Sequence, residues 1–462
     1  MQSLIILHSN DIHGRIEGLA RIATLLERVR AEHPDIPVLY VDGGDIEETS
    51  EYISNVTRGV AMHRLLSAAG CEVATVGNGG LLRYGPQLLE EYALAAQYPL
   101  LLANLRTTDG ETLPGTVPAT IIEAGSLRVG FIGLTAQFFD IYSTFFGLRT
   151  LPEMPLVQDL ARELRQQGAD IVIFLSHLGL ADDRKVAETV QDDVDLIIAA
   201  HTHEVLPEGE WVGKVPIVEA GMYAEYLGRV DIQRDGRQAT VQRISLIPVT
   251  DDIPRAERVL EENRTIEQEV LPFLNEIVGE LAEPLDFATD RECGAANLAA
   301  DMLRERMNAD VGLITTSIGI IASLPAGPLT RKTLWDACSS PANPGVVDMT
   351  GTQLTALITK GQDIEFAKDS PRAMRGMERG LIHLSGAVIR DGHILINDQP
   401  IEPERIYRVA GSDWELDTYG DYADPAWKLH PTYDVPVIIR EALEEYLQQH
   451  KPVHVTMGRL NE

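Results

Sequence analysis

The sequence predicts a two-domain α/β protein, and three observations support this fold class. In the first 250 residues, short apolar runs alternate with segments of helical periodicity, which is typical of a layered domain with buried sheets. The composition then becomes strongly acidic, and a second unit of alternating strands and helices begins near Gly294. The chain has 462 residues, enough for two or three domains that each bury a core.

Each strand of the first domain is expected at a short apolar run, several of them rich in Val and Ile. The runs are Leu4–Leu7, Val38–Val41, Val73–Val76, Leu100–Leu102, Val129–Leu134, Ile171–Leu175 and Leu196–Ala199. The segments Leu19–Ala31 and Val60–Ala69 between the early runs have the apolar spacing of helices. Residues 1–250 are therefore predicted to form the first domain.

An acidic connecting helix is predicted over residues 251–290. Residues 251–292 hold 13 acidic and 4 basic side chains, Ala256–Val270 has helical spacing, and Pro272 and Pro284 interrupt the segment. The second domain is expected over residues 291–462. Its predicted elements are a helix at Ala296–Met307 and strands at Val311–Thr315, Leu381–Val388, His393–Ile396 and Tyr407–Ala410.

The charge of the chain limits its partners. There are 39 basic and 70 acidic residues, a formal net charge of −31. This excess repels phosphate backbones and anionic lipid surfaces, so neither a nucleic-acid polymer nor a membrane is expected as a partner. Any phosphorylated substrate would need local positive charge to overcome the field.

The cysteines and the first residues favour a cytoplasmic location. Cys71, Cys293 and Cys338 are widely spaced, odd in number and without a C-x-x-C motif, which argues against a disulfide framework or a thiolate zinc site. Met1–Leu7 has the pattern of a first strand and not of a signal peptide, and no apolar run is long enough to span a membrane. The sequence gives no prediction of oligomeric state.

Polar side chains collect where the predicted strands of the first domain end. They are Asp11 and His13, Asp45, Asn78, His177, and His201 with His203. Loops at the carboxyl ends of strands in an α/β sheet converge, so these residues are expected to form one site. Carboxylate, amide and imidazole ligands suit Zn, Mn, Fe or Co, and a carboxylate shared by two ions would hold them about 3.5–4 Å apart.

Each of these motifs has a structural explanation when taken alone. A single D-x-H or H-x-H occurs by chance, His177 could be a hydrogen-bonded core histidine, and Gly43-Gly44 could be an ordinary turn. The joint pattern favours a metal site, because five strand ends carry ligand-type residues while the other histidines show no such placement.

The ordered motifs D-x-H-G, G-D, G-N, S-H-L-G and H-T-H resemble the calcineurin-like metallophosphoesterases. Together with Gly294–Asp301 and Leu324–Thr330 in the second domain, the chain is similar to the bacterial 5′-nucleotidase family, which also includes cyclic-nucleotide phosphodiesterases and nucleotide-sugar hydrolases. The resemblance implies a layered metallophosphoesterase sandwich followed by a 5′-nucleotidase-like, substrate-binding α/β domain. It is closest to cytoplasmic members that lack the usual G-N-H histidine.

The resemblance also implies a role for each of these residues. One divalent ion would take Asp11, His13 and His203, and the other would take Asn78, His177 and His201. Asp45 would bridge the two ions, and a water between them would attack the phosphorus in line with the leaving oxygen. Asp45 and Asn78 are therefore the expected catalytic residues, and Gly44 and Gly77 would let the backbone approach closely.

The chain departs from the family pattern beside Asn78. The family usually has G-N-H-[ED] with a nearby Asp that orients the His, whereas this chain has Gly79 and Leu82 at those positions. Loss of one such electrostatic donor costs about 10²–10³ in rate in other enzymes. Three interpretations are open: another residue supplies the donor, the chain is slow, or it is a binding protein that kept its metals.

The second domain departs from the pattern too. Ile321 stands at the position of the family's substrate-binding Arg, which leaves the metals as the main positive charge that the sequence identifies. Residues at the expected substrate-contact positions are Asn343, Asp413, Trp414 and Tyr419. Trp414 and Tyr419 are either base-stacking or packing aromatics. The expected activity is thus a metal-dependent phosphohydrolase acting on a small nucleotide-type phosphoester. The alternatives are a degenerate sensor or scaffold, or a hydrolase of a different ester.

Overall fold

Two six-stranded sheets form the N-terminal part of the computed structural model, which describes residues 2–236, 238–317, 319–338, 340–369, 379–417 and 420–460. The first sheet has the order β14 (Gln238–Pro248), β13 (Tyr226–Asp235), β1 (Gln2–Ser9), β2 (Val38–Asp42), β3 (Val73–Thr75) and β4 (Leu100–Leu101). The second has the order β11 (Glu210–Val212), β12 (Val215–Val218), β10 (Leu196–Ile198), β9 (Ile171–His177), β7 (Leu127–Thr135) and β6 (Ala119–Ala124).

The two sheets pack face to face around one apolar core. Leu4, Ile6 and Leu39 of the first sheet belong to the same buried cluster as Phe131 and Ile173 of the second. Most pairs in the middle of each sheet are parallel, from β1 through β4 and from β7 through β9 and β10 to β12. Their carboxyl ends therefore lie together at one edge of the sandwich.

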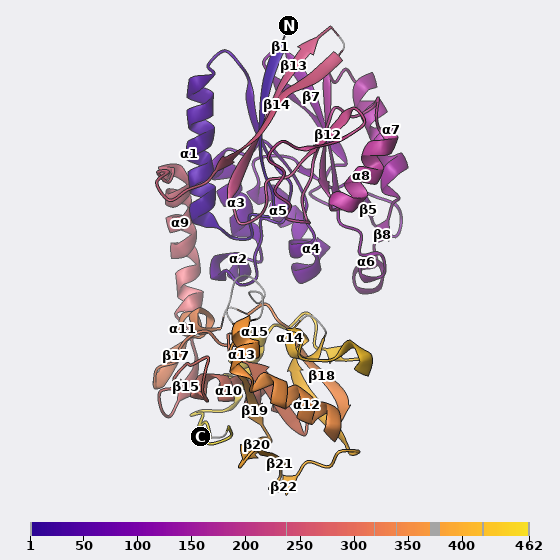
Figure 1. Ribbon diagram of the computed structural model, residues 1–462. Helices are drawn as coiled ribbons and strands as arrows, with labels where there is room; N and C mark the ends of the chain where they lie inside the picture. Colours follow the sequence, from indigo (N-terminus) through magenta and orange to yellow (C-terminus); the bar gives the residue numbers. More distant parts are fainter. Residues whose placement is uncertain are drawn as a thin grey trace. The chain divides into compact units, whose positions relative to one another are not determined.

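Helices cover the outer faces of the sandwich (Figure 1). The helices α1 (Ile16–Glu32) and α3 (Val60–Ala69) lie on the first sheet, and α7 (Glu153–Gln166) and α8 (Leu180–Thr189) lie on the second. On α7, Val157, Ala161 and Leu164 pack against Val172 and Phe174 of β9. This i, i+4, i+7 spacing is what makes α7 a covering helix. The connections contain α2 (Tyr52–Val56), α4 (Gly79–Tyr84), α5 (Leu89–Ala95), α6 (Phe139–Phe146), β5 (Leu105–Arg106) and β8 (Arg149–Thr150).

The chain divides into two units, Met1–Val270 and Leu271–Glu462. Helix α9 (Glu257–Leu274) runs across this division. The sequence had predicted helical spacing only as far as Val270. The helix instead continues through Pro272, in its last turn, and ends at Leu274. The predicted functional division at residues 250 and 290 stays a prediction.

The C-terminal unit is built on a five-stranded sheet. Its order is β19 (Ile382–Ser385), β16 (Val311–Thr315), β23 (Ile406–Ser412), β18 (Pro344–Thr350) and β24 (Thr432–Tyr433). The helices of the unit are α10 (Gly294–Arg306), α11 (Arg331–Ala337), α12 (Gly351–Gly361), α13 (Ile364–Asp369), α14 (Asp413–Leu416) and α15 (Ile439–Gln449). Two small sheets, β15 (Ile277–Leu281) with β17 (Gly327–Thr330), and β20 (Ala387–Arg390) with β21 (His393–Ile396) and β22 (Gln399–Pro400), complete it.

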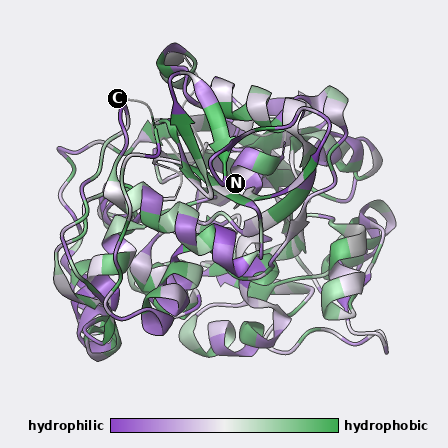
Figure 2. Cartoon of the chain, turned by 90° about the horizontal axis from the view of Figure 1, so that it is seen from below, coloured by the Kyte–Doolittle hydropathy of each residue, from purple (hydrophilic) through white to green (hydrophobic). Residues whose placement is uncertain are grey.

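The α/β fold class is confirmed, and a strand lies at each apolar run predicted in the first domain. The long antiparallel pair β13 and β14 was missed, because β14 is half exposed and carries no continuous apolar run. Figure 2 shows strands coloured mainly as hydrophobic and helices that carry both hydrophobic and hydrophilic residues. Among the described residues, no helix combines the length and the apolar character needed to cross a membrane.

Candidate metal centre

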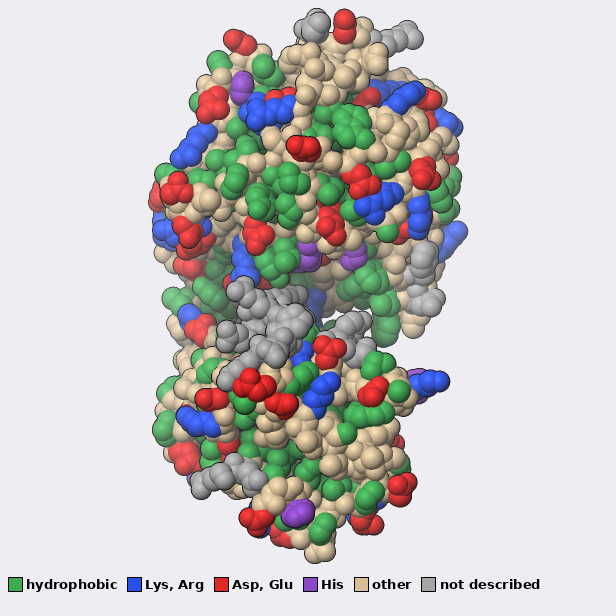
Figure 3. Space-filling model, viewed as in Figure 1, with side chains coloured by type: hydrophobic (Ala, Val, Ile, Leu, Met, Phe, Trp, Pro, Cys, Tyr) green, Lys and Arg blue, Asp and Glu red, His purple; other side chains and the backbone are tan. Residues whose placement is uncertain are grey.

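The predicted metal ligands follow strands from both sheets of the sandwich. Asp11 and His13 follow β1, Asp45 follows β2, and Asn78 lies between β3 and α4. From the second sheet, His177 is the last residue of β9, and His201 and His203 follow β10. Histidine side chains reach the surface of this unit close to one another (purple in Figure 3). The carboxyl edges of the two sheets thus bring together residues that are up to 192 positions apart, as Asp11 and His203 are.

Two groups of ligand atoms lie close enough to hold metal ions. In one, Asp11 Oδ1 lies 3.7 Å from His13 Nε2 and 3.3 Å from His203 Nε2. In the other, His177 Nε2 lies 3.9 Å from the same Asp11 oxygen and 3.3 Å from Asp45 Oδ2. Asp11 is therefore common to both groups, whereas the resemblance had implied that Asp45 is the bridging carboxylate, a role that stays a prediction.

Two further predicted ligands lie beside these groups. The ring of His201 is 5.3 Å from the ring of His177, measured between centroids. Asn78 precedes the first turn of α4, and its Oδ1 atom is buried. The structure thus places all seven predicted ligand residues at the same edge of the sandwich.

The ligand atoms themselves fit a cation. Asp11 Oδ1, Asn78 Oδ1 and His177 Nε2 are buried and form no hydrogen bond with any residue that the structure describes. Buried polar atoms are normally paired, because leaving one unpaired costs about 1–3 kcal/mol. These three unpaired atoms are all of ligand type, and four more ligand side chains lie around them. Together they form a donor set suited to divalent metals.

Hydrogen bonds turn the unpaired atoms toward the centre. His177 Nδ1 lies 2.7 Å from the Gly43 carbonyl, to which it donates, and this leaves Nε2 as the ligand atom. The other oxygen of Asp11, Oδ2, accepts from Asn10 Nδ2 at 2.8 Å and from the His201 backbone N–H at 3.0 Å. These contacts leave Asp11 Oδ1 and His177 Nε2 as the atoms that would face a metal ion.

Asn10 is a positioning residue that the sequence reasoning missed. Besides Asp11, its amide donates to the Gly221 carbonyl at 2.6 Å, and its Oδ1 accepts from the Ala220 N–H at 3.0 Å. It therefore ties the loop after β1 to the loop after β12. Its only signal in the sequence is its place directly before Asp11, which a scan for ligand-type residues passes over.

The electrostatics of the cluster favour positive charge. Burial opposes protonation of His177, but the carboxylates of Asp45 and Asp11 outweigh it and raise the pKa of His177 to about 10. Burial raises the pKa of Asp45, yet the neighbouring His177 and His13 lower it overall. The two buried carboxylates therefore favour positive charge beside His177, which a divalent ion would supply.

Five of the predicted ligands have a left-handed backbone: Asp11 (φ 50°), His13 (φ 44°), Asp45 (φ 54°), His201 (φ 75°) and His203 (φ 61°). This conformation is uncommon for residues with a side chain and costs of order 1 kcal/mol each. Strain of this kind collects at functional sites, where ligand geometry matters more than local stability.

Gly44 and Gly77 lie where two loops touch. A Cβ atom on Gly77 would lie 2.0 Å from Asp45 Oδ1, and one on Gly44 would lie 2.7 Å from the Gly77 nitrogen. Only glycine fits at either position without a shift of the loop that carries Asp45. The sequence had suggested such a close approach of the backbone.

Gly79, where the family has a histidine, contacts Asp45 directly. Its backbone N–H donates to Asp45 Oδ1 at 2.7 Å. A Cβ atom at this position would lie 3.1 Å from that oxygen, so a side chain fits only if the carboxylate moves by a few tenths of an ångström. Leu82 is partly buried one helical turn further along α4.

Three of the four predicted substrate-contact residues lie together in the C-terminal unit. The Asp413 N–H donates to the Asn343 carbonyl at 3.1 Å, and the Asn343 side chain donates to the Val437 carbonyl at 2.6 Å. Trp414 follows Asp413 in α14 and is only 8% exposed. Tyr419 lies outside the described residues. A role for any of them in binding substrate stays a prediction.

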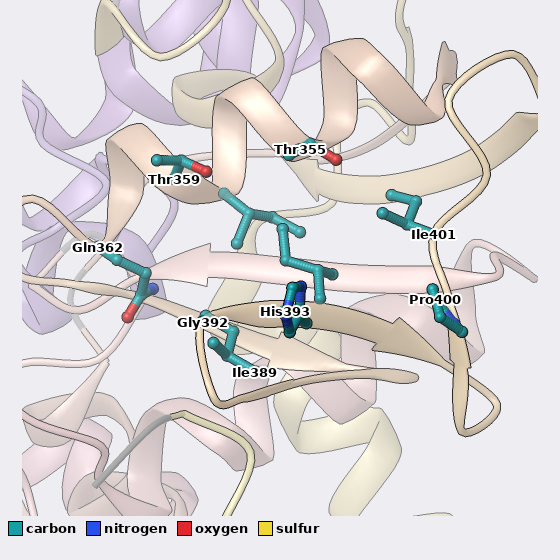
Figure 4. A pocket seen from close by; sticks show the side chains of 10 residues that line it. Thr355, Thr359, Gln362, Ile389, Gly392, His393, Pro400 and Ile401 are labelled. Atoms are coloured by element: carbon teal, nitrogen blue, oxygen red, sulfur yellow. The ribbon is translucent and has the colours of Figure 1, made fainter.

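The C-terminal unit also contains a cavity, and Asn343, Asp413 and Trp414 are not among the residues that line it. It lies between α12 and the small β20–β22 sheet, has a volume of about 360 Å³, and is lined by side chains such as Thr355, Gln362, His393 and Ile401 (Figure 4). The lining contains no Asp, Glu, Lys or Arg, so it offers no permanently charged side chain to a phosphoester.

The fold and the ligand cluster define a metallophosphoesterase. Residues 4–205 match the family model for calcineurin-like phosphoesterases, and residues 277–423 match that for the 5′-nucleotidase C-terminal domain. The chain belongs to the 5′-nucleotidase family, as the motifs had indicated, and calcineurin-like phosphoesterases bind divalent metals.

Three relatives illustrate the range of this similarity. The uncharacterized metallophosphoesterase YunD of Bacillus subtilis is 27% identical and matches over 89% of this chain and 92% of its own. A putative 5′-nucleotidase from Staphylococcus aureus, solved in complex with alpha-ketoglutarate, superposes with a TM-score of 0.67 at 17% identity over all of both chains. The sulfate thiohydrolase SoxB of Thermus thermophilus superposes with a TM-score of 0.59 at 18% identity, covering 100% of this chain and 96% of its own.

Proposed function

We propose that this protein hydrolyses a small-molecule phosphoester of nucleotide type with two divalent metal ions bound at the carboxyl edge of the sandwich. The observation that carries the proposal is the convergence of seven ligand-type residues with three buried, unpaired ligand atoms, Asp11 Oδ1, Asn78 Oδ1 and His177 Nε2. Two separable groups of ligand atoms meet at Asp11, which supports two ions over one.

The residues of the chain set the geometry of this reaction. Bound divalent ions lower the pKa of water and polarise phosphoryl oxygens, which is the chemistry that phosphoester hydrolysis needs. The Gly79 N–H donates to Asp45, and His177 donates to the Gly43 carbonyl. These hydrogen bonds hold the ligand atoms of Asp45 and His177 in position. Asn78 offers a neutral oxygen that adds a ligand without adding negative charge beside an anionic substrate.

The substrate class is inferred from the C-terminal unit and from the charge. The match to a 5′-nucleotidase C-terminal domain supports a nucleotide as the substrate. A net charge of −31 disfavours a polymer of phosphates and leaves small phosphoesters that reach the metals. Nucleotide catabolism is therefore the process that we propose.

A cytoplasmic location is part of the same proposal. Cys71, Cys293 and Cys338 are all buried and unpaired as disulfides, and burial raises the pKa of each thiol. Free, unreactive thiols are typical of proteins that stay in a reducing compartment.

Two alternatives have specific support. Gly79 and Leu82 remove the usual histidine–aspartate pair, which favours a protein that binds metals but turns over slowly or not at all. The similarity in fold to SoxB, named as a sulfate thiohydrolase, favours a hydrolase of a different ester.

The decisive experiment measures metal content and ester cleavage together. The full chain is loaded with Mn²⁺, Co²⁺ or Zn²⁺ and tested on nucleoside monophosphates, cyclic nucleotides, an aryl phosphate and a thiosulfate ester. We expect release of phosphate that requires the metal, with the highest rate on a nucleotide. Asp45→Asn and His177→Asn should each lower metal content and remove activity.

The outcomes separate the three functions. His393→Asn is the matched control, because it removes an exposed histidine far along the chain from the cluster and should change neither readout. Full metal content without cleavage of any ester would support the sensor, and cleavage of the sulfur ester alone would support the different hydrolase. Full activity in Asp45→Asn would refute the site.

A further inference from the structure

A buried tyrosine hydroxyl in the N-terminal unit has no hydrogen-bond partner. Tyr142 of α6 is fully buried, and its hydroxyl forms no hydrogen bond with any residue that the structure describes. The hydroxyl of Thr135, the last residue of β7, is likewise buried and unpaired in the described part of the chain. Buried hydroxyl groups are normally paired, because leaving one unpaired costs stability. Two of them in one place point to an acceptor that binds there.

Thr135 lies directly beside the metal centre. In the parallel pair of β7 and β9, it is the register partner of His177, a predicted metal ligand. The side chain of Asn104 holds the backbone of Thr135 on both sides, since it donates to the Thr135 carbonyl at 2.7 Å and accepts from the Thr135 N–H at 3.0 Å. The position of the unpaired Thr135 hydroxyl is therefore fixed by buried contacts.

Tyr142 reaches the same centre from α6. The ring of Phe138 lies 6.2 Å from the ring of Tyr142 and 6.1 Å from that of the predicted ligand His201, measured between centroids. Burial raises the pKa of Tyr142, the Thr135 side chain opposes this rise, and the carboxylate of Asp45 adds to it. The phenol therefore keeps its proton, and it lies within electrostatic reach of Asp45.

The position of the missing histidine is next to Asp45 as well. The Gly79 N–H donates to Asp45 Oδ1 at 2.7 Å, and a Cβ atom on Gly79 would lie 3.1 Å from that oxygen. Gly79 belongs to α4 and Tyr142 to α6, and the two helices lie at the same end of the sandwich (Figure 1). A phenol donates a hydrogen bond as a histidine does, but without charge, so its bond is roughly half as strong.

Packing alone does not account for the hydroxyl of Tyr142. Helix α6 also contains Phe145 and Phe146, which take their places in it without a polar group. A phenylalanine at position 142 would fill the same volume less one oxygen atom and would leave no buried donor unpaired. We therefore attribute the hydroxyl to binding and only the ring to packing.

We propose that the Tyr142 hydroxyl donates a hydrogen bond to the phosphoryl group bound at the metal centre, with the Thr135 hydroxyl as a second donor, in place of the histidine that is missing at Gly79. This inference rests on the proposed function for the identity of the substrate. The hydrogen bond strengthens as negative charge develops on the phosphoryl oxygens, so it contributes more to kcat than to KM.

Kinetics of the full chain loaded with Mn²⁺ give the first test. Tyr142→Phe removes one oxygen atom and keeps the ring. We expect it to lower kcat on the best phosphoester about 100-fold and to change KM less than about threefold, with metal content unchanged. Thr135→Val should lower kcat about tenfold. An unchanged kcat in Tyr142→Phe, or a loss of metal as large as its loss of kcat, would overturn the proposal.

Urea unfolding of the metal-free chain separates this role from a structural one. A hydroxyl without a partner does not stabilise the fold, so Tyr142→Phe should leave the urea midpoint unchanged or raise it. The matched control is Tyr92→Phe, because Tyr92 is also buried but its hydroxyl donates to the Arg58 carbonyl at 2.7 Å. This control should lower the midpoint and leave kcat unchanged. A lower midpoint in Tyr142→Phe would show that its hydroxyl is paired within the fold and would contradict the proposal.

Binding of inorganic phosphate to the Mn²⁺-loaded chain, measured by calorimetry, tests the contact without turnover. Tyr142→Phe should weaken binding at least about threefold, and Tyr92→Phe should not. If the wild type shows this pattern but cleaves no ester, the proposed function fails and the Tyr142 contact stands. If the wild type cleaves esters and Tyr142→Phe matches it in kcat and in phosphate affinity, the inference fails and the proposed function stands. A wild type that neither binds phosphate nor cleaves an ester would refute both.

Discussion

At the scale of single residues, the metal centre depends on backbone positions that are costly to form. Asp11, Asp45 and His203 all have positive φ angles, and together they supply ligand atoms to both groups. The loops that carry them are held by buried contacts, such as the Asp11 N–H to the Gly44 carbonyl at 2.9 Å. The strain persists because these contacts over-determine the loops.

Gly77→Ala adds only one methyl group, yet we expect it to weaken metal binding strongly. The new methyl group would lie 2.0 Å from Asp45 Oδ1 and 2.3 Å from the Asp45 nitrogen, so the loop of Asp45 must move. We expect Mn²⁺ affinity, measured by calorimetry, to fall at least about 100-fold, since a displaced carboxylate loses a charged interaction of roughly 3 kcal/mol.

Gly147→Ala provides the comparison. Gly147 has a φ of 64°, so alanine costs about 1 kcal/mol there, but no atom lies within 4 Å of the new methyl group. This variant should keep its metal affinity. Equal Mn²⁺ affinity in Gly77→Ala and Gly147→Ala would contradict a close contact between Gly77 and the Asp45 loop.

His383 should make the C-terminal unit sensitive to acid. Its Nε2 accepts from the Cys293 N–H at 2.9 Å and must be unprotonated to do so. Burial lowers the pKa of His383 to about 4, below the value of about 6.5 in an unfolded chain. Its contribution to stability is thus complete above pH 6.5 and is lost as the pH falls toward 4, by up to about 1.4 kcal/mol per pH unit.

Urea unfolding at pH 7.5 and 5.0 measures this dependence. His383→Gln keeps an acceptor but cannot take up a proton, so the difference in unfolding free energy between the two pH values should shrink. His393→Gln, which replaces an exposed histidine, should retain the wild-type difference. Equal pH dependence in wild type and His383→Gln would show that His383 does not titrate differently on folding.

At the scale of elements, helix α4 carries both positions, Gly79 and Leu82, at which the histidine–aspartate pair of the family is missing. Its first residue, Gly79, lies directly over Asp45, and residue 82 lies one turn later on the same face. A histidine–aspartate pair placed there would point a charged donor toward the same space as the Asp45 carboxylate. We therefore expect the departure to affect catalysis more than metal binding.

The double variant Gly79→His with Leu82→Asp should raise kcat about tenfold or more. This gain is below the 10²–10³ that one electrostatic donor supplies elsewhere, because the new Cβ lies 3.1 Å from Asp45 Oδ1 and pushes that ligand. Steady-state kinetics on the best nucleotide substrate measure it, and metal content is checked in parallel. Leu82→Asp alone is the control, and an unchanged kcat in the double variant would mean that another donor already serves.

At the scale of the whole molecule, acidic and basic side chains are interspersed over the visible face, with acidic ones in excess (Figure 3). Asp11 and Asp45 are two of the 70 acidic residues, and two divalent ions would add +4 beside them. Metal binding should therefore matter for stability as well as for attraction of an anionic substrate.

Saturating Mn²⁺ should raise the melting temperature of the N-terminal unit specifically. The ions bind the folded site only, so at 100 times Kd each stabilises by about 2.7 kcal/mol. Differential scanning calorimetry with and without a chelator should show one transition that moves and one that does not. Asp45→Asn should abolish the shift, and an equal shift of both transitions would contradict a site confined to one unit.

Local patterns in the sequence were enough to predict much of this protein. Apolar runs such as Ile171–Leu175 became strands because buried parallel strands need continuous apolar residues. Ligand-type residues at the ends of those runs indicated a metal centre, because the carboxyl ends of such strands converge. The motifs also indicated the family.

Only the tertiary structure decided which atoms meet. It made Asp11 common to both ligand groups and placed Gly77 against Asp45. Contacts of this kind join segments that are distant in the chain. Periodicity and spacing report only what neighbouring residues prefer, whereas packing of the closed fold determines these long-range distances.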